Sequence, residues 1–167
     1  MRDRFLIFGA PHIEQAEIDE VVSSMRSGWL GTGPKVRRFE ERFAAYKGVT
    51  DAAALNSCTA ALHLSMLAAG LGPGDEVITT PLTFCATVNA VLHTGATPVL
   101  ADVDPVTMNI DPDAVAARVT SKTKAIVPVH FGGRPCDMDR LMSIADARGI
   151  TVIEDCAHAI ETQYHGR

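Results

Sequence analysis

Little in this 167-residue chain is suited to binding nucleic acid or a membrane. Lysine and arginine number 15 against 20 aspartate and glutamate residues, which gives a net charge of −5. A chain without a basic surplus lacks the positive surface that attracts nucleic acid or anionic lipid. Aromatic residues make up only 5%, too few for platforms that stack single-stranded bases. No apolar run approaches the roughly 20 residues that span a bilayer. We therefore expect no nucleic-acid partner and no membrane insertion.

Signals for export and for disulfide bonding are also missing. The first residues, Met1-Arg2-Asp3-Arg4-Phe5, do not form the apolar stretch with a small-residue cleavage site that marks a secretion signal. The four cysteines are widely spaced, with no CxxC pair: Cys58, Cys85, Cys136 and Cys156. Without a secretion signal, free thiols are favoured over disulfides. The sequence thus predicts a cytoplasmic protein.

Three fingerprints that are common in α/β proteins do not occur. The chain has no glycine-rich dinucleotide motif, no Walker loop and no GxSxG elbow. Dinucleotide-dependent redox chemistry, P-loop phosphate transfer and α/β-hydrolase catalysis therefore lose their usual sequence support.

What the chain does contain is an alternation of helix and strand patterns. Two amphipathic helices are expected first, at 13–26 and 36–46, separated by the turn sequence Gly31-Thr32-Gly33-Pro34. Strands are then expected at 52–56, 76–80, 98–103, 124–130 and 151–155, with helices at 60–69, 84–93, 111–119 and 137–148. Strand segments such as Ala-Ile-Val-Pro-Val are apolar without alternation, which is typical of strands covered on both faces. We predict an α/β fold with three layers, in which a mainly parallel sheet carries helices on both faces.

Small hydroxylic residues occur where the 52–56 strand should turn into a helix. The segment is Asn56-Ser57-Cys58-Thr59-Ala60-Ala61-Leu62. A helix N-terminus presents free N–H groups and the positive end of the helix dipole, which together can bind phosphate. The competing interpretation is an ordinary N-cap by Ser57 or Thr59. The sequence leaves both open.

Two further segments lie at expected strand ends, where open α/β sheets bind ligands. Phe84 could stack on a flat cofactor ring or could be a core residue. Asp155 could form an ion pair with a protonated pyridine nitrogen or could cap a helix. Asp155, Cys156 and His158 could also hold a metal, although their spacing fits no standard zinc pattern. His130 ends another strand at this edge, and the simplest interpretation is a structural histidine with satisfied hydrogen bonds.

These segments, taken in order, resemble one enzyme family. The chain is similar to the DegT/StrS group of fold-type I, pyridoxal-phosphate-dependent aminotransferases, which act on nucleotide-linked keto-sugars. The similarity rests on six segments that span nearly the whole chain. They are Ser27-Gly28-Trp29-Leu30-Gly31-Thr32-Gly33-Pro34, Asn56 to Leu62, Gly74-Asp75-Glu76-Val77-Ile78-Thr79-Thr80-Pro81, Thr83-Phe84-Cys85-Ala86-Thr87, Pro128-Val129-His130 and Glu154-Asp155-Cys156-Ala157-His158.

The resemblance implies a role for seven residues. Cys58 and Thr59 would hold the phosphate of pyridoxal 5'-phosphate, and Phe84 would stack on its pyridine ring. Asp155 would pair with the ring nitrogen, and His158 would lie near the ring hydroxyl. Two residues would line the sugar-nucleotide side, Gly31 and Thr32. The resemblance further implies glutamate as amino donor, a nucleotide-linked keto-sugar as acceptor, and a homodimer with shared active sites.

One family feature has no counterpart in these residues. Relatives carry the Schiff-base lysine after the Glu-Asp motif, in a Ser-Phe-x-x-x-Lys segment. The lysines of this chain all precede Asp155: Lys35, Lys47, Lys122 and Lys124. We therefore expect residues 1–167 to be the N-terminal part of the large, cofactor-binding domain, from a fragment or a truncated reading frame that lacks the C-terminal small domain.

Two other functions compete with this reading. Without the lysine, the helix N-terminus at Thr59 and the Phe84 ring could form a non-catalytic module that binds a phosphate ligand. Alternatively, a metal-dependent hydrolase could use Asp155, His158 and His130.

Overall fold

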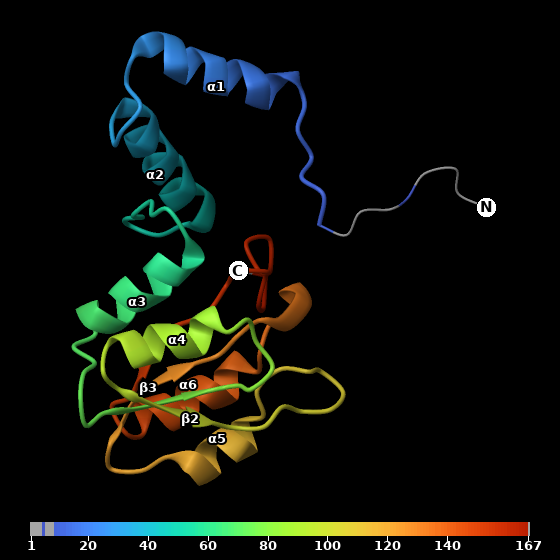
Figure 1. The fold of residues 1–167 in the computed structure, drawn as a ribbon. Coiled ribbons are helices and arrows are strands. Elements are labelled where there is room, and N and C mark those ends of the chain that lie inside the picture. The colour runs from blue at the N-terminus through green and yellow to red at the C-terminus, as the bar shows by residue number, and fades with distance from the viewer. Residues whose placement is uncertain (1–4, 6–8, 167) are drawn as a thin grey trace. The chain divides into compact units, whose positions relative to one another are not determined.

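A computed structural model describes residue 5 and residues 9–166 (Figure 1). The chain divides into two compact units, Met1–Ala54 and Leu55–Arg167, and each is described by itself. The expectation of a cytoplasmic location rests partly on residues 1–4, which lie outside the described residues. Within the described part, no helix is both long enough and apolar enough to cross a membrane.

The N-terminal unit contains the two expected helices, α1 (Gln15–Ser27) and α2 (Pro34–Lys47). A capping box starts α1, in which the Glu17 carboxylate accepts the Glu14 N–H at 2.7 Å. Each helix ends at a glycine in the left-handed conformation, a common helix C-terminus that most other residues adopt only with strain. The termini predicted from sequence are therefore nearly right.

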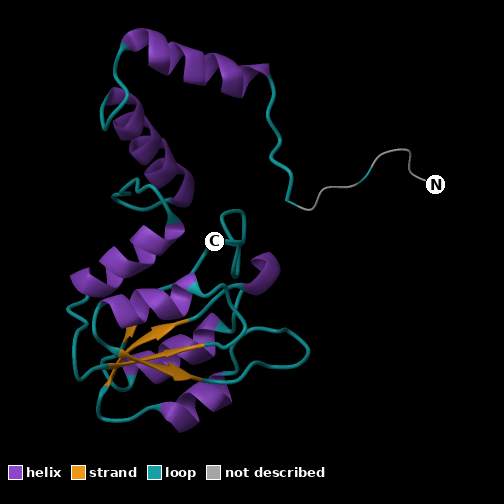
Figure 2. Ribbon diagram, viewed as in Figure 1, coloured by secondary structure: helices purple, strands orange, loops and turns teal. Residues whose placement is uncertain are grey.

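The second unit is built on a parallel sheet of four strands (Figure 2). The strands are β1 (Glu76–Thr79), β2 (Thr97–Leu100), β3 (Thr123–Val127) and β4 (Thr151–Val152), in the order β2-β1-β3-β4. All three pairings are parallel, with Ile78 opposite Val99 in β2 and Ile126 in β3. The sequence prediction of a parallel sheet is confirmed.

Helices cover both faces of this sheet. On one face, α3 (Cys58–Ala68) and α4 (Ala86–His93) pack Met66 and Val91 against β1 and β3. On the other, α5 (Pro112–Arg118) and α6 (Met138–Asp146) pack Val115 and Leu141 against Ile126. Successive strand residues thus enter opposite cores, which explains why the strands are apolar throughout. The three-layer prediction is confirmed.

The prediction of a strand at 52–56 is wrong, because this segment is a loop that joins no strand ladder. Its three consecutive alanines have a low strand propensity and little apolar surface to bury. The other four strands all end earlier than expected. Past the ends of β3 and β4, Val129 and Asp155 are paired by an isolated bridge.

The connections after β1 and β3 leave toward opposite faces of the sheet. The chain passes from β1 into α4 on one face, whereas it passes from β3 through a short 3-10 helix, η1 (Phe131–Gly133), into α6 on the other. Because β1 and β3 are neighbours, their carboxyl ends form a topological switch point, where open α/β sheets bind ligands.

Candidate functional site

Asp155 is anchored at this carboxyl edge. Its N–H donates to the Pro128 carbonyl at 2.9 Å, and its own carbonyl accepts from the His130 N–H at 3.3 Å. The residue is 5% exposed. The backbone that follows β3 therefore fixes a buried carboxylate beside the switch point.

Neutral groups surround the Asp155 carboxylate. Oδ2 accepts a hydrogen bond from the Thr87 hydroxyl at 2.8 Å, and Oδ1 accepts from the Ala157 N–H at 3.1 Å. The Cys58 thiol lies 3.8 Å from Oδ1. Among the described residues, no lysine, arginine or histidine forms an ion pair with Asp155. Buried charges are normally paired, so this carboxylate is suited to receive a cation from a ligand.

The interpretation of Asp155 as a helix N-cap is wrong, because no helix follows it in the part of the chain that the structure describes. The bond from the Ala157 N–H closes a turn, and the chain continues through turns rather than into a helix. His158 is exposed in that turn, three residues after Asp155.

The N-terminus of α3 adjoins Asp155 through Cys58. Ser57 is the N-cap, and its hydroxyl accepts the Ala60 N–H at 3.1 Å. Cys58 and Thr59 occupy the first turn, where N–H groups have no intrahelical acceptor. Ser57 is thus a cap, as one interpretation predicted, and the first-turn N–H groups are still suited to an anion.

The Cys58 thiol stays neutral beside the carboxylate. Burial raises its pKa, and the negative charge of Asp155 and the hydrogen bond to it raise it further. A protonated thiol can donate to Oδ1, so Cys58 adds a donor and no second negative charge.

Phe84 follows β1 and is 79% exposed, so its interpretation as a core residue is wrong. Its carbonyl accepts the Thr87 N–H at 3.2 Å, at the start of α4. Because Thr87 in turn binds Asp155, a short backbone segment links the exposed ring to the buried carboxylate. The ring has a free surface on which a flat ligand can stack.

Gly31 and Thr32 lie in the N-terminal unit, in the loop between α1 and α2. The Thr32 carbonyl accepts the Trp29 indole N–H at 2.9 Å. A Cβ on Gly33 would lie 2.0 Å from the Trp29 indole nitrogen, which explains the glycine there. The predicted contact of Gly31 and Thr32 with a sugar nucleotide stays a prediction.

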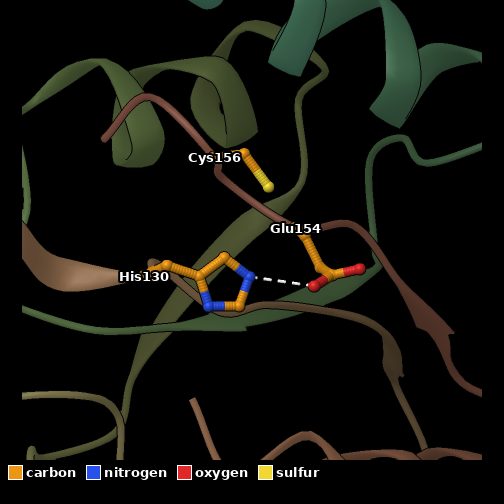
Figure 3. Close-up of side chains that lie close together, drawn as sticks. All are labelled: His130, Glu154 and Cys156. Carbon is orange, nitrogen blue, oxygen red and sulfur yellow. Dashed lines mark hydrogen bonds and ion pairs between the residues drawn. The ribbon is translucent and has the colours of Figure 1, made fainter. Parts of the chain in front are cut away.

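His130, Glu154 and Cys156 form a second cluster at this edge (Figure 3). His130 is buried, and its Nε2 lies 2.8 Å from Glu154 Oε2. Its Nδ1 accepts the Cys136 N–H at 3.1 Å. The proton of a neutral ring must therefore sit on Nε2 and be donated to Glu154. This hydrogen bond holds the pKa of the Glu154 carboxyl below its usual range.

This tautomer argues against a metal in the cluster. The three ligand atoms lie within 4.8 Å of one another, but a metal would need the Nε2 lone pair. The ring proton would then have to move to Nδ1, where it would face the Cys136 N–H. The gathered residues also differ from the hydrolase set, which was Asp155, His158 and His130. His130 fits the interpretation of a satisfied structural histidine.

Sequence reasoning missed Thr87, which supplies the shortest hydrogen bond to Asp155. Thr83 and Thr87 lie on either side of the start of the helix expected at 84–93, but no sequence pattern singles out Thr87. Its partner Asp155 follows 68 positions later.

Comparison with known proteins gives relatives over nearly the whole chain. "Spore coat polysaccharide biosynthesis protein SpsC" of Bacillus subtilis (strain 168) is 55% identical over 166 residues, which are 99% of this chain and 43% of SpsC. An aminotransferase from Psychrobacter cryohalolentis superposes with a TM-score of 0.91 at 45% identity, over 94% of this chain and 40% of that one. The PLP form of Spr1654 from Streptococcus pneumoniae gives a TM-score of 0.92 at 38% identity, over 97% of this chain and 45% of that one.

The chain thus spans about two fifths of the length of each of these three proteins. Residues 11–167 match one protein family along their full extent. The chain belongs to the DegT/DnrJ/EryC1/StrS aminotransferase family.

Proposed function

We propose that this chain supplies the N-terminal part of a pyridoxal-phosphate-dependent enzyme that transfers the amino group of glutamate to a nucleotide-linked keto-sugar. The family depends on pyridoxal 5'-phosphate. The observation that carries the proposal is the buried Asp155 carboxylate, whose hydrogen-bond partners in the described part of the chain are neutral and which lies beside a helix N-terminus.

The residues present fit this cofactor. Its ring nitrogen carries a proton when paired with a carboxylate, and Asp155 is a buried carboxylate that forms no ion pair with any cationic side chain the structure describes. Its phosphate is a dianion, and the first turn of α3 offers the Cys58 and Thr59 N–H groups and the Thr59 hydroxyl. Phe84 would cover the ring, and we assign His158 to the side of the ring hydroxyl.

When bound, the cofactor supplies a protonated ring that withdraws electrons from the carbon where the amino group is exchanged. Asp155 keeps the proton on the ring nitrogen, because a buried ion pair is screened less than an exposed one. The α3 N-terminus and the Phe84 ring orient the cofactor. A lysine would transfer the proton at the reacting carbon. We place this lysine outside residues 1–167, because the four lysines here all precede Asp155.

The substrates and the assembly are further proposals. SpsC is named for spore coat polysaccharide biosynthesis, which supports a sugar as amino acceptor. We assign Gly31 and Thr32 to the sugar-nucleotide side, and we propose a cytoplasmic homodimer with shared active sites.

The test uses the complete protein, which is the full product of the gene that encodes this chain. It is loaded with pyridoxal 5'-phosphate and mixed with glutamate, and the cofactor's absorbance is followed while 2-oxoglutarate is measured. We expect one 2-oxoglutarate per cofactor, and subsequent loss of the amino group to a nucleotide-linked keto-sugar. Removing one partner of a buried ion pair costs about 3–5 kcal/mol, so Asp155→Asn should slow the glutamate step about 10²- to 10⁴-fold.

Asp146→Asn is the matched control, because Asp146 is exposed at the end of α6. It should react like the wild type. Cofactor binding without any 2-oxoglutarate would overturn the proposal in favour of a phosphate-ligand-binding module. Equal rates for Asp155→Asn and the wild type would overturn the role of Asp155.

A further inference from the structure

A chain of two hydroxyls supports the Asp155 carboxylate. The Thr83 and Thr87 hydroxyl oxygens lie 2.7 Å apart, and the Thr87 hydroxyl lies 2.8 Å from Asp155 Oδ2. Thr87 is completely buried in the first turn of α4. Thr83 lies in the loop between β1 and α4.

The direction of each hydrogen bond follows from proton counting. Thr87 has one hydroxyl proton and three possible acceptors: the Thr83 hydroxyl oxygen at 2.7 Å, Asp155 Oδ2 at 2.8 Å and the Phe84 carbonyl at 3.2 Å. A charged carboxylate is a stronger acceptor than a hydroxyl or a carbonyl, so the proton goes to Asp155. Thr87 then accepts from the Thr83 hydroxyl, and this polarises its own O–H toward Oδ2.

The two carboxylate oxygens of Asp155 differ in how many further hydrogen bonds they can accept. Among the described residues, Oδ1 already accepts from the Ala157 N–H and the Cys58 thiol, whereas Oδ2 accepts only from Thr87. Each oxygen of a carboxylate has about two acceptor positions. Oδ2 therefore keeps one position for a ligand.

We propose that Thr87, supported by Thr83, is a positioning residue that fixes the Asp155 carboxylate so that the remaining acceptor position of Oδ2 receives the ring N–H of the cofactor. The proposal rests on the proposed function. The torsion that rotates a carboxylate is broad and roughly two-fold, so burial alone does not fix it. The groups of residues 5 and 9–166 that form hydrogen bonds with Asp155 are neutral: the Thr87 hydroxyl, the Cys58 thiol and the main-chain groups of Pro128, His130 and Ala157.

The experiment compares three variants of the complete protein as holoenzyme. Thr87→Val removes the hydroxyl with little change in shape, and Thr87→Ser keeps it. Thr79→Val is the matched control: Thr79 is also completely buried, but its hydroxyl donates to the Val127 carbonyl within the sheet. The probe is pyridoxal 5'-phosphate labelled with ¹⁵N in the ring, whose chemical shift reports ring protonation, together with the cofactor's dissociation constant.

We expect Thr87→Val to move the ¹⁵N signal toward the unprotonated position, with a protonation constant about tenfold lower. Thr87→Ser should restore the signal, and Thr79→Val should leave it unchanged. If Thr87→Val does not fold, Thr83→Val should produce a smaller shift in the same direction. An unchanged ¹⁵N signal in both Thr87→Val and Thr83→Val, or an equal shift in Thr79→Val, overturns the positioning role. An unprotonated ring nitrogen in the wild type overturns the proposed role of Asp155 as well, so the two failures are distinguishable.

Discussion

Replacing Phe84 with alanine should separate cofactor binding from stability. The ring is 79% exposed, so its removal creates no cavity. Surface substitutions of this kind usually change the free energy of unfolding by no more than about 0.5 kcal/mol. We therefore expect the chain with Phe84→Ala to unfold at nearly the wild-type urea concentration.

Cofactor affinity should respond differently. Aromatic stacking contributes about 0.5–1.5 kcal/mol beyond the burial of area. Because 1.36 kcal/mol corresponds to a factor of ten, the loss of stacking alone should weaken pyridoxal 5'-phosphate binding about 2- to 13-fold. The burial of the ring by the cofactor would add to this.

Equilibrium dialysis of the complete protein and urea unfolding measure the two effects. Val106→Ala is the matched control, since Val106 is 78% exposed on the loop after β2. It should change neither quantity. A wild-type dissociation constant for Phe84→Ala would refute the stacking role. A loss of stability well above 1 kcal/mol would refute the exposed position of the ring.

Three further predictions concern the scaffold of the site, each measured by urea unfolding. Leu141→Ala should lower the free energy of unfolding by about 2–5 kcal/mol, because Leu141 is completely buried under the sheet. Substitution of its exposed neighbour, Met142→Ala, should lower it by about 0.5 kcal/mol or less. Equal losses of stability would refute the packing of α6. Ser57→Ala should lower the free energy of unfolding by about 1 kcal/mol through loss of the α3 cap, and Ser57→Gly by only a few tenths of a kcal/mol. Equal stabilities of the two variants would contradict the capping role of Ser57. The pKa of Glu154 is lowered in the folded chain by its hydrogen bond to His130, so the stability from this bond is present above the pKa of an unfolded glutamate and is lost as pH falls through the folded pKa. Glu154→Gln should therefore be less stable than the wild type at pH 7, and the difference should shrink in acid; a constant difference would contradict the assignment.

The layered architecture was predictable because burial on both faces leaves a mark on the sequence. Continuous apolar segments such as residues 125–129 are typical of strands that helices cover on both sides, and the intervening amphipathic patterns supplied the helices. Glycine at the ends of α1 and α2 marked the helix termini. The segment 52–56 was wrongly predicted as a strand because it precedes a helix; it joins no strand ladder, and the Ala54 N–H donates to the Glu40 carboxylate.

The candidate site was predictable only in part. Asp155 and the α3 N-terminus occur at strand and helix ends, which the alternation locates. The partners of Asp155 come from distant parts of the chain, since the Cys58 thiol and the Thr87 hydroxyl precede it by 97 and 68 positions. The tautomer of His130 depends on one backbone N–H of Cys136, which no sequence pattern reveals. Such contacts are fixed by tertiary packing, which local sequence does not encode.

A crystal structure of the complete protein with pyridoxal 5'-phosphate would test the central claim most directly. We expect an Asp155 carboxylate oxygen to lie about 3 Å from the ring nitrogen, the phosphate to lie against the first turn of α3, and the Phe84 ring to cover the pyridine. A cofactor bound elsewhere, or a ring nitrogen that faces a group other than Asp155, would contradict it.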